Sequence, residues 1–280
     1  MSPIISAAEL SSLLSNQHLI LLDATNSKDA FEQFSNCHIL GTQFIDTNTA
    51  LADLSDDAKN GGRHPLPKPE AFAKTLSELG ISPTDHIVIY DQFNGANAAA
   101  RCWWMLKSIG HEQVQVLDGG LKAAIKSGIP TSNTAVSKKN KTNYQVSNWR
   151  LPIVDMQFVA DHVQLDDYLV IDVREEKRFN GEIEPIDLVA GHIPGAINVP
   201  FQGNLDENGY FISPTELKEK YRLILGDFPV EKQIVHCGSG VTACHTLLAL
   251  HYAGFEFPNL YVGSWSEWSR NNLPIGKHID

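Results

Sequence analysis

An internal repeat limits the possible architectures of this chain more than any other feature of its sequence. Pro3–Ser6 (PIIS) returns as Pro152–Asp155 (PIVD), and Leu19–Thr25 (LILLDAT) returns as Tyr168–Arg174 (YLVIDVR), each about 150 positions further on. Three more stretches of the first half, HILGTQFI, HIVIYD and VLDGGLKAA, return in the same order as HIPGAINV, QIVHCG and YVGSWSEWS. Five matches in one order predict two homologous domains of about 130 residues each.

The domains predicted from this repeat are residues 1–130 and 150–280, joined by a linker over residues 131–149. The linker region is rich in Ser, Thr, Asn and Lys, a composition typical of an exposed connector. It contains the only cationic cluster of the sequence, Lys138-Lys139-Asn140-Lys141, which we interpret as solvated linker rather than as a binding patch.

Short aliphatic and β-branched runs alternate with helical patterns in both halves. Such alternation predicts an α/β fold in which each domain is a parallel sheet flanked by helices on both faces. Near the start, Ser6 and Glu9 have the spacing of a capping box, which predicts a helix directly after a short strand. The other predicted strands are Leu19–Leu22, Ile87–Ile89 and Val114–Leu117 in the first half, and Leu169–Val173, Ile197–Val199 and Ile234–Val235 in the second.

Charge and hydropathy argue against two classes of partner. The chain of 280 residues has a net charge of −11 and a pI near 5.4, so it lacks a basic face to neutralise nucleic-acid phosphates. No apolar run approaches the length of about 20 residues that spans a bilayer, and the first residues lack the basic and apolar regions of a secretory signal. We therefore expect no nucleic-acid partner and no membrane association.

Cysteine usage indicates a reducing compartment. Four cysteines in a chain of this length do not make a disulfide framework, so free thiols are expected. We expect a cytoplasmic protein in which Cys37 and Cys102 have structural roles. The remaining two, Cys237 and Cys244, lie close together in the second half.

Of these thiols, Cys237 is placed for chemistry. It follows the predicted strand Ile234–Val235, and Gly238-Ser239-Gly240 allow a tight turn before a helical pattern resumes at Val241. In a parallel sheet, ligands bind beyond the carboxyl ends of the strands. The amide groups of such a loop, the hydroxyls of Ser239 and Thr242 and the positive end of the helix would stabilise a thiolate or a persulfide without any cation.

The alternative interpretation is that Cys237 is a small buried hydrophobe, the usual role of a free cysteine. A buried core cysteine does not require a glycine-rich turn. The first repeat also provides an internal control, because it keeps the surrounding pattern with Asp91 in place of the thiol. We therefore predict that Cys237 is a nucleophile and that the first domain is not catalytic.

Rival chemistries do not fit the local spacing. A cysteine phosphatase needs an arginine where Ala243 stands, and a serine hydrolase elbow needs glycine at position 237. Workable zinc spacing is absent from the four nearby candidates, His236, Cys237, Cys244 and His245. We expect no metal and no cofactor, and we interpret Cys244 and His245 as packing and surface residues of the helix.

At this point the sequence resembles a known family. The motif CGSGVTACH, with DVREEKRFNG, GHIPGAINVPF and YVGSWSEW, is similar to the tandem-domain rhodanese sulfurtransferases, and the likeness extends from Pro3 to Trp268. The loop Cys-Gly-Ser-Gly-Val-Thr resembles the 3-mercaptopyruvate sulfurtransferase branch, whereas thiosulfate-preferring members have charged residues after the cysteine. An uncharged loop is also better matched to a neutral or singly charged sulfur donor than to the thiosulfate dianion.

The resemblance implies roles for individual residues. Cys237 would be the nucleophile, Arg178 the arginine that binds the carboxylate of the donor, and Ser239 and His64 parts of a proton relay. The loop residues that would contact the donor are Gly238, Gly240, Val241 and Thr242.

The sequence also departs from the pattern of this branch. Ile186 lies near the place of a second arginine, and Asn48 occupies the position of the relay acid, with Asp46 two residues earlier. Arg63 and Arg101 are candidates for additional positive potential. Arg174 is expected to form a structural ion pair.

The resulting expectation is a sulfurtransferase that moves sulfur from 3-mercaptopyruvate through a Cys237 persulfide to a thiol, a thioredoxin-like protein or cyanide, releasing pyruvate. Two alternatives stay open. Thiosulfate is one possible donor, and the other alternative is a persulfide carrier loaded by a partner protein. A phosphatase is a remote third.

Overall fold

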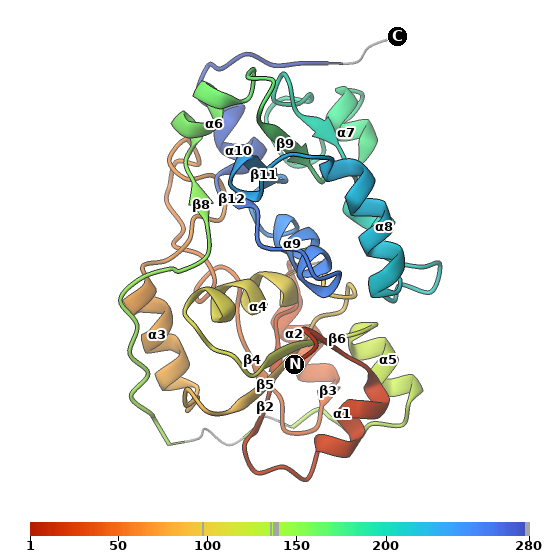
Figure 1. Cartoon of the computed structure of the whole chain (residues 1–280). Coiled ribbons are helices and arrows are strands. Elements are labelled where there is room, and N and C mark those ends of the chain that lie inside the picture. Colours follow the sequence, from red (N-terminus) through yellow and green to blue (C-terminus); the bar gives the residue numbers. More distant parts are fainter. Residues whose placement is uncertain (97, 135, 137–139, 278–280) are drawn as a thin grey trace. The chain divides into compact units, whose positions relative to one another are not determined.

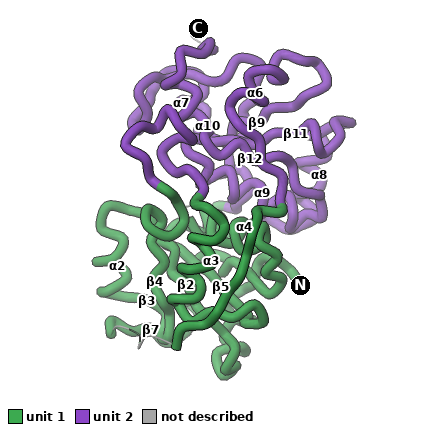
Figure 2. The backbone as a smooth tube through the Cα atoms, turned by 90° about the vertical axis from the view of Figure 1, so that its left-hand side faces the viewer, with its two compact units in different colours: residues 1–53, 67–150, 207–211 green, residues 54–66, 151–206, 212–280 purple. Residues whose placement is uncertain are grey.

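The computed structural model describes the chain except residues 97, 135, 137–139 and 278–280, so Lys138 and Lys139 of the cationic cluster lie outside the described residues. The chain forms two compact units, shown in Figure 2. Their composition is as follows: unit 1 consists of Met1–Asp53, Pro67–Arg150 and Glu207–Phe211, and unit 2 of Leu54–Leu66, Leu151–Asp206 and Ile212–Asp280. Each unit therefore includes a short segment from the opposite half of the sequence.

Unit 1 is built around a five-stranded parallel sheet (Figure 1). In spatial order its strands are β1 (Ile4–Ile5), β6 (Val114–Leu117), β5 (His86–Tyr90), β2 (Leu19–Asp23) and β4 (Gln43–Phe44). A separate antiparallel pair joins β3 (His38–Ile39) to β7 (Thr131–Ser132). The helices of this unit are α1 (Ala7–Leu13), α2 (Ala30–Asn36), α3 (Pro69–Glu78), α4 (Ala99–Ser108) and α5 (Gly120–Lys126).

Unit 2 repeats this topology. The spatial order of its parallel sheet is β10 (Ile197–Asn198), β9 (Leu169–Asp172), β11 (Gln233–His236), β12 (Asn259–Tyr261) and β8 (Ile153–Val154). Its helices are α6 (Met156–His162), α7 (Glu176–Asn180), α8 (Pro214–Leu225), α9 (Ala243–Tyr252) and α10 (Ser264–Trp268), with 3₁₀ turns η1 (Phe201–Asn204) and η2 (Val230–Lys232). Counted in chain order, equivalent strands occupy equivalent places in the two sheets.

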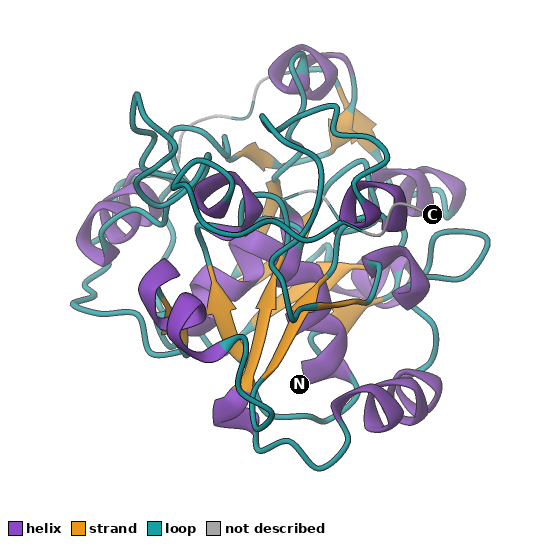
Figure 3. Cartoon of the chain, turned by 90° about the horizontal axis from the view of Figure 1, so that it is seen from above, coloured by secondary structure: helices purple, strands orange, loops and turns teal. Residues whose placement is uncertain are grey.

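The predicted α/β class and the predicted strands are confirmed, and Figure 3 shows helices around the strands. The capping box is also present, because Glu9 N–H donates to Ser6 Oγ and Ser6 N–H donates to the Glu9 carboxylate. All residues of the central strands β5 and β11 are buried, as expected for strands covered on both faces. Within the described residues, the helices are too short and too polar to cross a bilayer.

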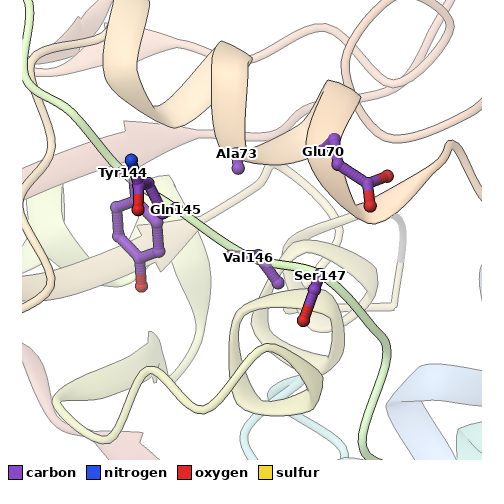
Figure 4. A pocket seen from close by; sticks show the side chains of 6 residues that line it. All are labelled: Glu70, Ala73, Tyr144, Gln145, Val146 and Ser147. Carbon is purple, nitrogen blue, oxygen red and sulfur yellow. The ribbon is translucent and has the colours of Figure 1, made fainter.

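The end of the segment predicted as linker packs on unit 1. Thr142 N–H donates to the carbonyl of Ser77 at 3.1 Å, and Tyr144 N–H donates to Ser77 Oγ at 2.9 Å, so this part of the chain follows α3. A pocket of about 480 Å³ lies beside this helix, and Figure 4 shows the side chains that line it. It is lined by Glu70, Ala73, Tyr144, Gln145, Val146 and Ser147, a set without a nucleophilic thiol or an imidazole.

Candidate active site at the end of strand β11

Cys237 directly follows β11, the middle strand of the unit 2 sheet, as the sequence predicts. Its backbone is fixed by α10: Cys237 N–H donates to Ser264 Oγ at 3.1 Å, and Trp265 N–H donates to the Cys237 carbonyl at 3.0 Å. The next residue is held in the same way, because Ser266 N–H donates to the Gly238 carbonyl at 2.8 Å. The cysteine is 2% exposed, so only a small or slender donor can approach the thiol.

The loop after Cys237 turns as its glycines predict. Gly240 has a φ of +73°, a conformation that favours glycine, and Thr242 occupies the N-cap position of α9. The first amide groups of a helix lack carbonyl partners, and the helix dipole makes this end positive. Val241 is buried, whereas Thr242 is half-buried. The loop therefore brings the thiol to the positive end of α9.

A hydroxyl and an imidazole meet beside this loop. His64 Nδ1 and Ser239 Oγ are 2.8 Å apart, although 175 positions separate the two residues in the sequence. Ser239 is buried and His64 half-buried. Both residues belong to unit 2, because the segment Leu54–Leu66 is part of that unit. The two proposed relay residues are thus within hydrogen-bonding distance of each other.

The segment that carries His64 is anchored to α10. Gly61 N–H donates to Glu267 Oε1 at 2.7 Å, and Arg63 N–H donates to Ser266 Oγ at 3.0 Å. Between them, Gly62 has a φ of +80°, and a Cβ at this position would collide with the carbonyl oxygen of Gly263. This close approach requires glycine.

Two guanidinium groups lie beside Gly238. A Cβ placed on this glycine would be 3.1 Å from Nη2 of Arg63 and 3.6 Å from Nη2 of Arg178. Arg178 is predominantly paired within its own unit, because its Nη2 donates to Glu184 Oε1 at 2.7 Å. None of the loop's own residues from Gly238 to Thr242 is charged. The positive charge instead comes from two distant segments of the chain.

A buried carboxylate, Asp187, organises these arginines. Its Oδ1 accepts from Arg63 Nε and from Arg270 Nη1, each at 3.0 Å, and its Oδ2 lies 3.5 Å from Arg178 Nη2. The Asp187 side chain has no exposed surface. Asp187, Glu184 and Arg270 were not among the site residues predicted from the sequence. The available signal in the sequence was two acidic residues, Glu184 and Asp187, that alternate with the apolar residues Ile183, Ile186 and Leu188.

Arg174 forms the structural ion pair that the sequence predicts. Its Nη2 donates to Asp172 Oδ2 at 2.7 Å, and its guanidinium lies 4.7 Å from the ring centroid of Trp265. Full burial disfavours the charged carboxylate, but the adjacent guanidinium outweighs this effect and holds the pKa of Asp172 below its ordinary value. Burial lowers the pKa of His236, which lies 3.8 Å from Asp172, so this imidazole is neutral at pH 7.

The other candidate residues lie away from this chemistry. Cys102 is fully buried, and burial raises the pKa of its thiol, so it remains protonated. The interpretation of His245 as a surface residue is wrong: it and Cys244 are both buried, as is every residue of α9 from Ala243 to Leu250. In the described part of the chain, no cluster of three or more His, Cys, Asp or Glu side chains is arranged to hold a metal.

Two further candidates belong to unit 1. Arg101 is fully buried there, and its Nη2 donates to the carbonyl of Leu51 at 3.3 Å. Asp46, next to the position of the relay acid at Asn48, accepts hydrogen bonds from the amide and hydroxyl of Thr49. The role of an acid in the relay therefore stays a prediction.

The unit 1 loop that corresponds to the Cys237 loop holds a carboxylate. Asp91 follows β5, and its Oδ1 accepts from the amides of Phe93 and Gly95 at 2.8 and 2.9 Å. Its Oδ2 accepts from the amide of Ala99 at 3.0 Å. The carboxylate of Asp91 thus accepts the hydrogen bonds of these three amide groups.

We compared the chain with known proteins to identify the class that has this fold and a thiol at the end of the central strand. The model of the rhodanese-like domain matches residues 6–127 and 155–271. The chain therefore belongs to the rhodanese family, as the resemblance implied, and contains two of its domains.

Relatives match over almost their whole length. A probable 3-mercaptopyruvate sulfurtransferase from Pseudomonas aeruginosa is 38% identical over 95% of this chain and 94% of that protein. A putative thiosulfate sulfurtransferase, SseB from Mycobacterium tuberculosis, is 34% identical over 98% of this chain and 96% of that protein. The crystal structure of SseA from Escherichia coli, described among 3-mercaptopyruvate sulfotransferases, has a TM-score of 0.79 and 31% identity, covering 95% of this chain and all of that one.

Proposed function

We propose that this protein is a sulfurtransferase in which Cys237 accepts sulfur from 3-mercaptopyruvate and passes it to a second acceptor. The observation that carries the proposal is the position of Cys237 in a loop beside the Ser239–His64 pair, whose side chains lie 2.8 Å apart. The names of close relatives support the enzyme class: they are sulfurtransferases, with a 3-mercaptopyruvate sulfurtransferase at 38% identity. The predicted family and enzyme class are thus confirmed.

In the first half-reaction, the thiolate of Cys237 attacks the sulfur of the donor. A sulfur–sulfur bond forms, the carbon–sulfur bond of the donor breaks, and its electron pair moves into pyruvate as the enolate. Ser239 gives its hydroxyl proton to the enolate, and His64 supplies a proton to Ser239 in turn. The product is pyruvate and a persulfide on Cys237.

In the second half-reaction, an acceptor thiolate attacks the outer sulfur of the persulfide and restores the Cys237 thiolate. The acceptor is a small thiol, cyanide or the exposed cysteine of a thioredoxin-like protein. Cys237 is 2% exposed, so the acceptor must be slender enough to reach a sulfur atom on a buried residue. Such a bound intermediate implies ping-pong kinetics.

Thiosulfate is a second candidate donor, because two guanidinium groups lie beside Gly238. A compact dianion requires cations near the nucleophile, and Arg63 and Arg178 bring positive charge to the loop without being part of it. A persulfide carrier loaded by a partner protein uses the same thiol. Comparing turnover with mercaptopyruvate and with thiosulfate separates these donors, and inertness toward both, with transfer from a protein persulfide, identifies a carrier.

We also propose a cytoplasmic location. All four cysteines are free in the structure. A nucleophilic thiol without a disulfide partner stays active in a reducing compartment.

Mass spectrometry of the digested protein tests the mechanism. Brief exposure to 3-mercaptopyruvate without an acceptor should add about 32 Da, one sulfur atom, to the peptide that contains Cys237. This first step should release pyruvate in an amount equal to the sulfur added, and a thiol added afterwards should remove the extra mass. Full turnover with an unmodified Cys237 would disprove the mechanism.

A further inference from the structure

We propose that Arg63 supplies a second guanidinium group for the carboxylate of the sulfur donor, beside Arg178, to which the family resemblance already gives this role, and that Asp187 is the positioning residue that holds Arg63 in place. This inference rests on the proposed function and assigns the selectivity for a carboxylate-bearing donor to a residue from the first half of the sequence. Its basis is the approach of both guanidinium groups to Gly238, the residue next to the nucleophile.

The donors on both arginines are only partly used. Arg63 donates to Asp187 through Nε and Nη2, and Arg178 donates through Nε and Nη2 to Glu184. Within the described residues, Nη1 of each has no hydrogen-bond acceptor from the protein. The Arg63 side chain is 26% exposed and that of Arg178 is 11% exposed, so both groups have access to a ligand. Two fixed guanidinium groups with unused N–H donors suit a planar carboxylate.

The surrounding charges also leave room for one anion. In the described part of the chain, the ion-pair network around Asp187 joins four arginines to three carboxylates and so has a formal excess of one positive charge. The neighbouring His236 does not add to this excess, because burial lowers its pKa and keeps it neutral. The network consists of Arg63, Arg174, Arg178 and Arg270 with Asp172, Glu184 and Asp187.

Asp187 fixes the direction of Arg63. It receives two hydrogen bonds from this guanidinium, 3.0 Å from Nε and 3.3 Å from Nη2, which is the bidentate geometry of an arginine–carboxylate pair. The main chain of Arg63 is fixed separately, by its bond to Ser266. With both ends held, the guanidinium has a defined place beside Gly238. Loss of Asp187 should therefore weaken donor binding without removing any group that touches the donor.

Two donors that differ by one group test the proposal. Mercaptoacetone has the thiol and carbonyl of 3-mercaptopyruvate but carries a methyl group in place of the carboxylate. For Arg63→Gln we expect KM for mercaptopyruvate to rise about 10- to 100-fold, the range for a lost hydrogen-bonded charge, with kcat within about threefold. Kinetic constants for mercaptoacetone should change by less than about threefold. Arg63→Lys should bind mercaptopyruvate more tightly than Arg63→Gln but less tightly than the wild type, because lysine keeps the positive charge and loses the paired N–H donors of the guanidinium.

Asp187→Asn should raise KM for mercaptopyruvate in the same direction, and pyruvate should inhibit both variants more weakly than the wild type. The matched control is Arg222→Gln, which removes an exposed arginine of α8 and should leave both donors unaffected. If Asp187→Asn does not fold, Arg63→Gln still decides the proposal. An unchanged ratio of kcat/KM for the two donors in Arg63→Gln would overturn it. A wild-type protein that forms no persulfide from mercaptopyruvate would instead refute the proposed function.

Discussion

The loops after β5 and β11 occupy the same place in two sheets of the same topology, yet they hold different groups. After β5, the carboxylate of Asp91 accepts hydrogen bonds from three amide groups of its own loop and of the start of α4. After β11, a thiol stands at the equivalent position, and a glycine follows where the first unit has Gln92. The same loop position thus holds a stable carboxylate in the first unit and a thiol that can react as a thiolate in the second.

The comparison shows that the loop after the central strand can have a structural role in one unit and suit a chemical role in the other. A resident carboxylate satisfies the amides permanently and stabilises unit 1. A thiol is a weaker acceptor than a carboxylate, so a loop that carries a thiol suits a thiolate, a persulfide or the developing charge of the donor. Moreover, Ser239 stands where the first loop has Phe93, and only the serine can exchange a proton with an imidazole.

Replacing the thiol by the residue of the first loop should have the largest effect. We expect Cys237→Asp to fold but to lose sulfurtransferase activity by at least about a thousandfold, because a carboxylate cannot form a persulfide. A coupled pyruvate assay measures the loss. Cys37→Ser, which changes a partly exposed cysteine at the end of α2, is the control and should retain full activity. Residual turnover in Cys237→Asp above this limit would show that the difference between the loops is not catalytic.

Removing the carboxylate of the first loop should affect stability. Asp91→Ala leaves three amide groups without their acceptor, two of them in buried hydrogen bonds, and should lower the free energy of unfolding of unit 1 by about 3 kcal/mol. Hydrogen exchange of the β5 and α4 amides measures this loss within the full chain. Asp91→Asn keeps one acceptor oxygen and should lose less. Equal protection in Asp91→Ala and wild type would contradict the structural role of the carboxylate.

Removing either member of the His64–Ser239 pair should have the next largest effect. We expect His64→Gln and Ser239→Ala each to lower kcat about a hundredfold, the usual range for acid–base groups. The double variant should be no slower than the single variants, because the two side chains act as one unit. His18→Gln, at an exposed histidine of unit 1, serves as the control. If the losses of kcat in the double variant equalled the product of the two single losses, the side chains would act independently and the prediction would be wrong.

The smallest expected effect is a pH dependence of stability. Burial lowers the pKa of His245 to about 3, whereas an unfolded histidine takes up its proton near pH 6.5. The contribution of the neutral imidazole is therefore complete above pH 6.5 and is lost as the pH falls toward 3, by up to about 1.4 kcal/mol per pH unit. Between pH 7.5 and 5.5, urea unfolding should show a loss for the wild type that exceeds that of His245→Asn by about 1 kcal/mol. Parallel pH profiles would contradict this assignment.

Much of the architecture is predictable because it depends on local patterns. The repeat predicts two equivalent sheets, and the run Ile234–Val235 before a glycine-rich turn places Cys237 at the end of a central strand. Glycine at 238 and 240 also predicts a tight loop, and Gly240 has the expected positive φ. These features follow from neighbouring residues, whose conformational preferences are visible in the sequence.

The charges of the site could not be predicted in the same way. Arg63 and Asp187 are 124 positions apart, and only the fold brings them within 3.0 Å. A single sequence indicates that each residue is charged but not which partner it meets. The pairing of His64 with Ser239 was foreseen through a family resemblance rather than through physics, whereas Asp187, Glu184 and Arg270 had no such guide.

The placement of Leu54–Leu66 in unit 2 has a consequence for dividing the protein. A fragment that starts at the repeat boundary would keep Cys237 and Ser239 but lack Arg63 and His64, so genetic separation of the halves should yield an incomplete enzyme. Adding a synthetic peptide with the sequence of residues 54–66 should restore part of its activity. The catalytic copy of the repeat thus depends on the sequence of the other copy for part of its site.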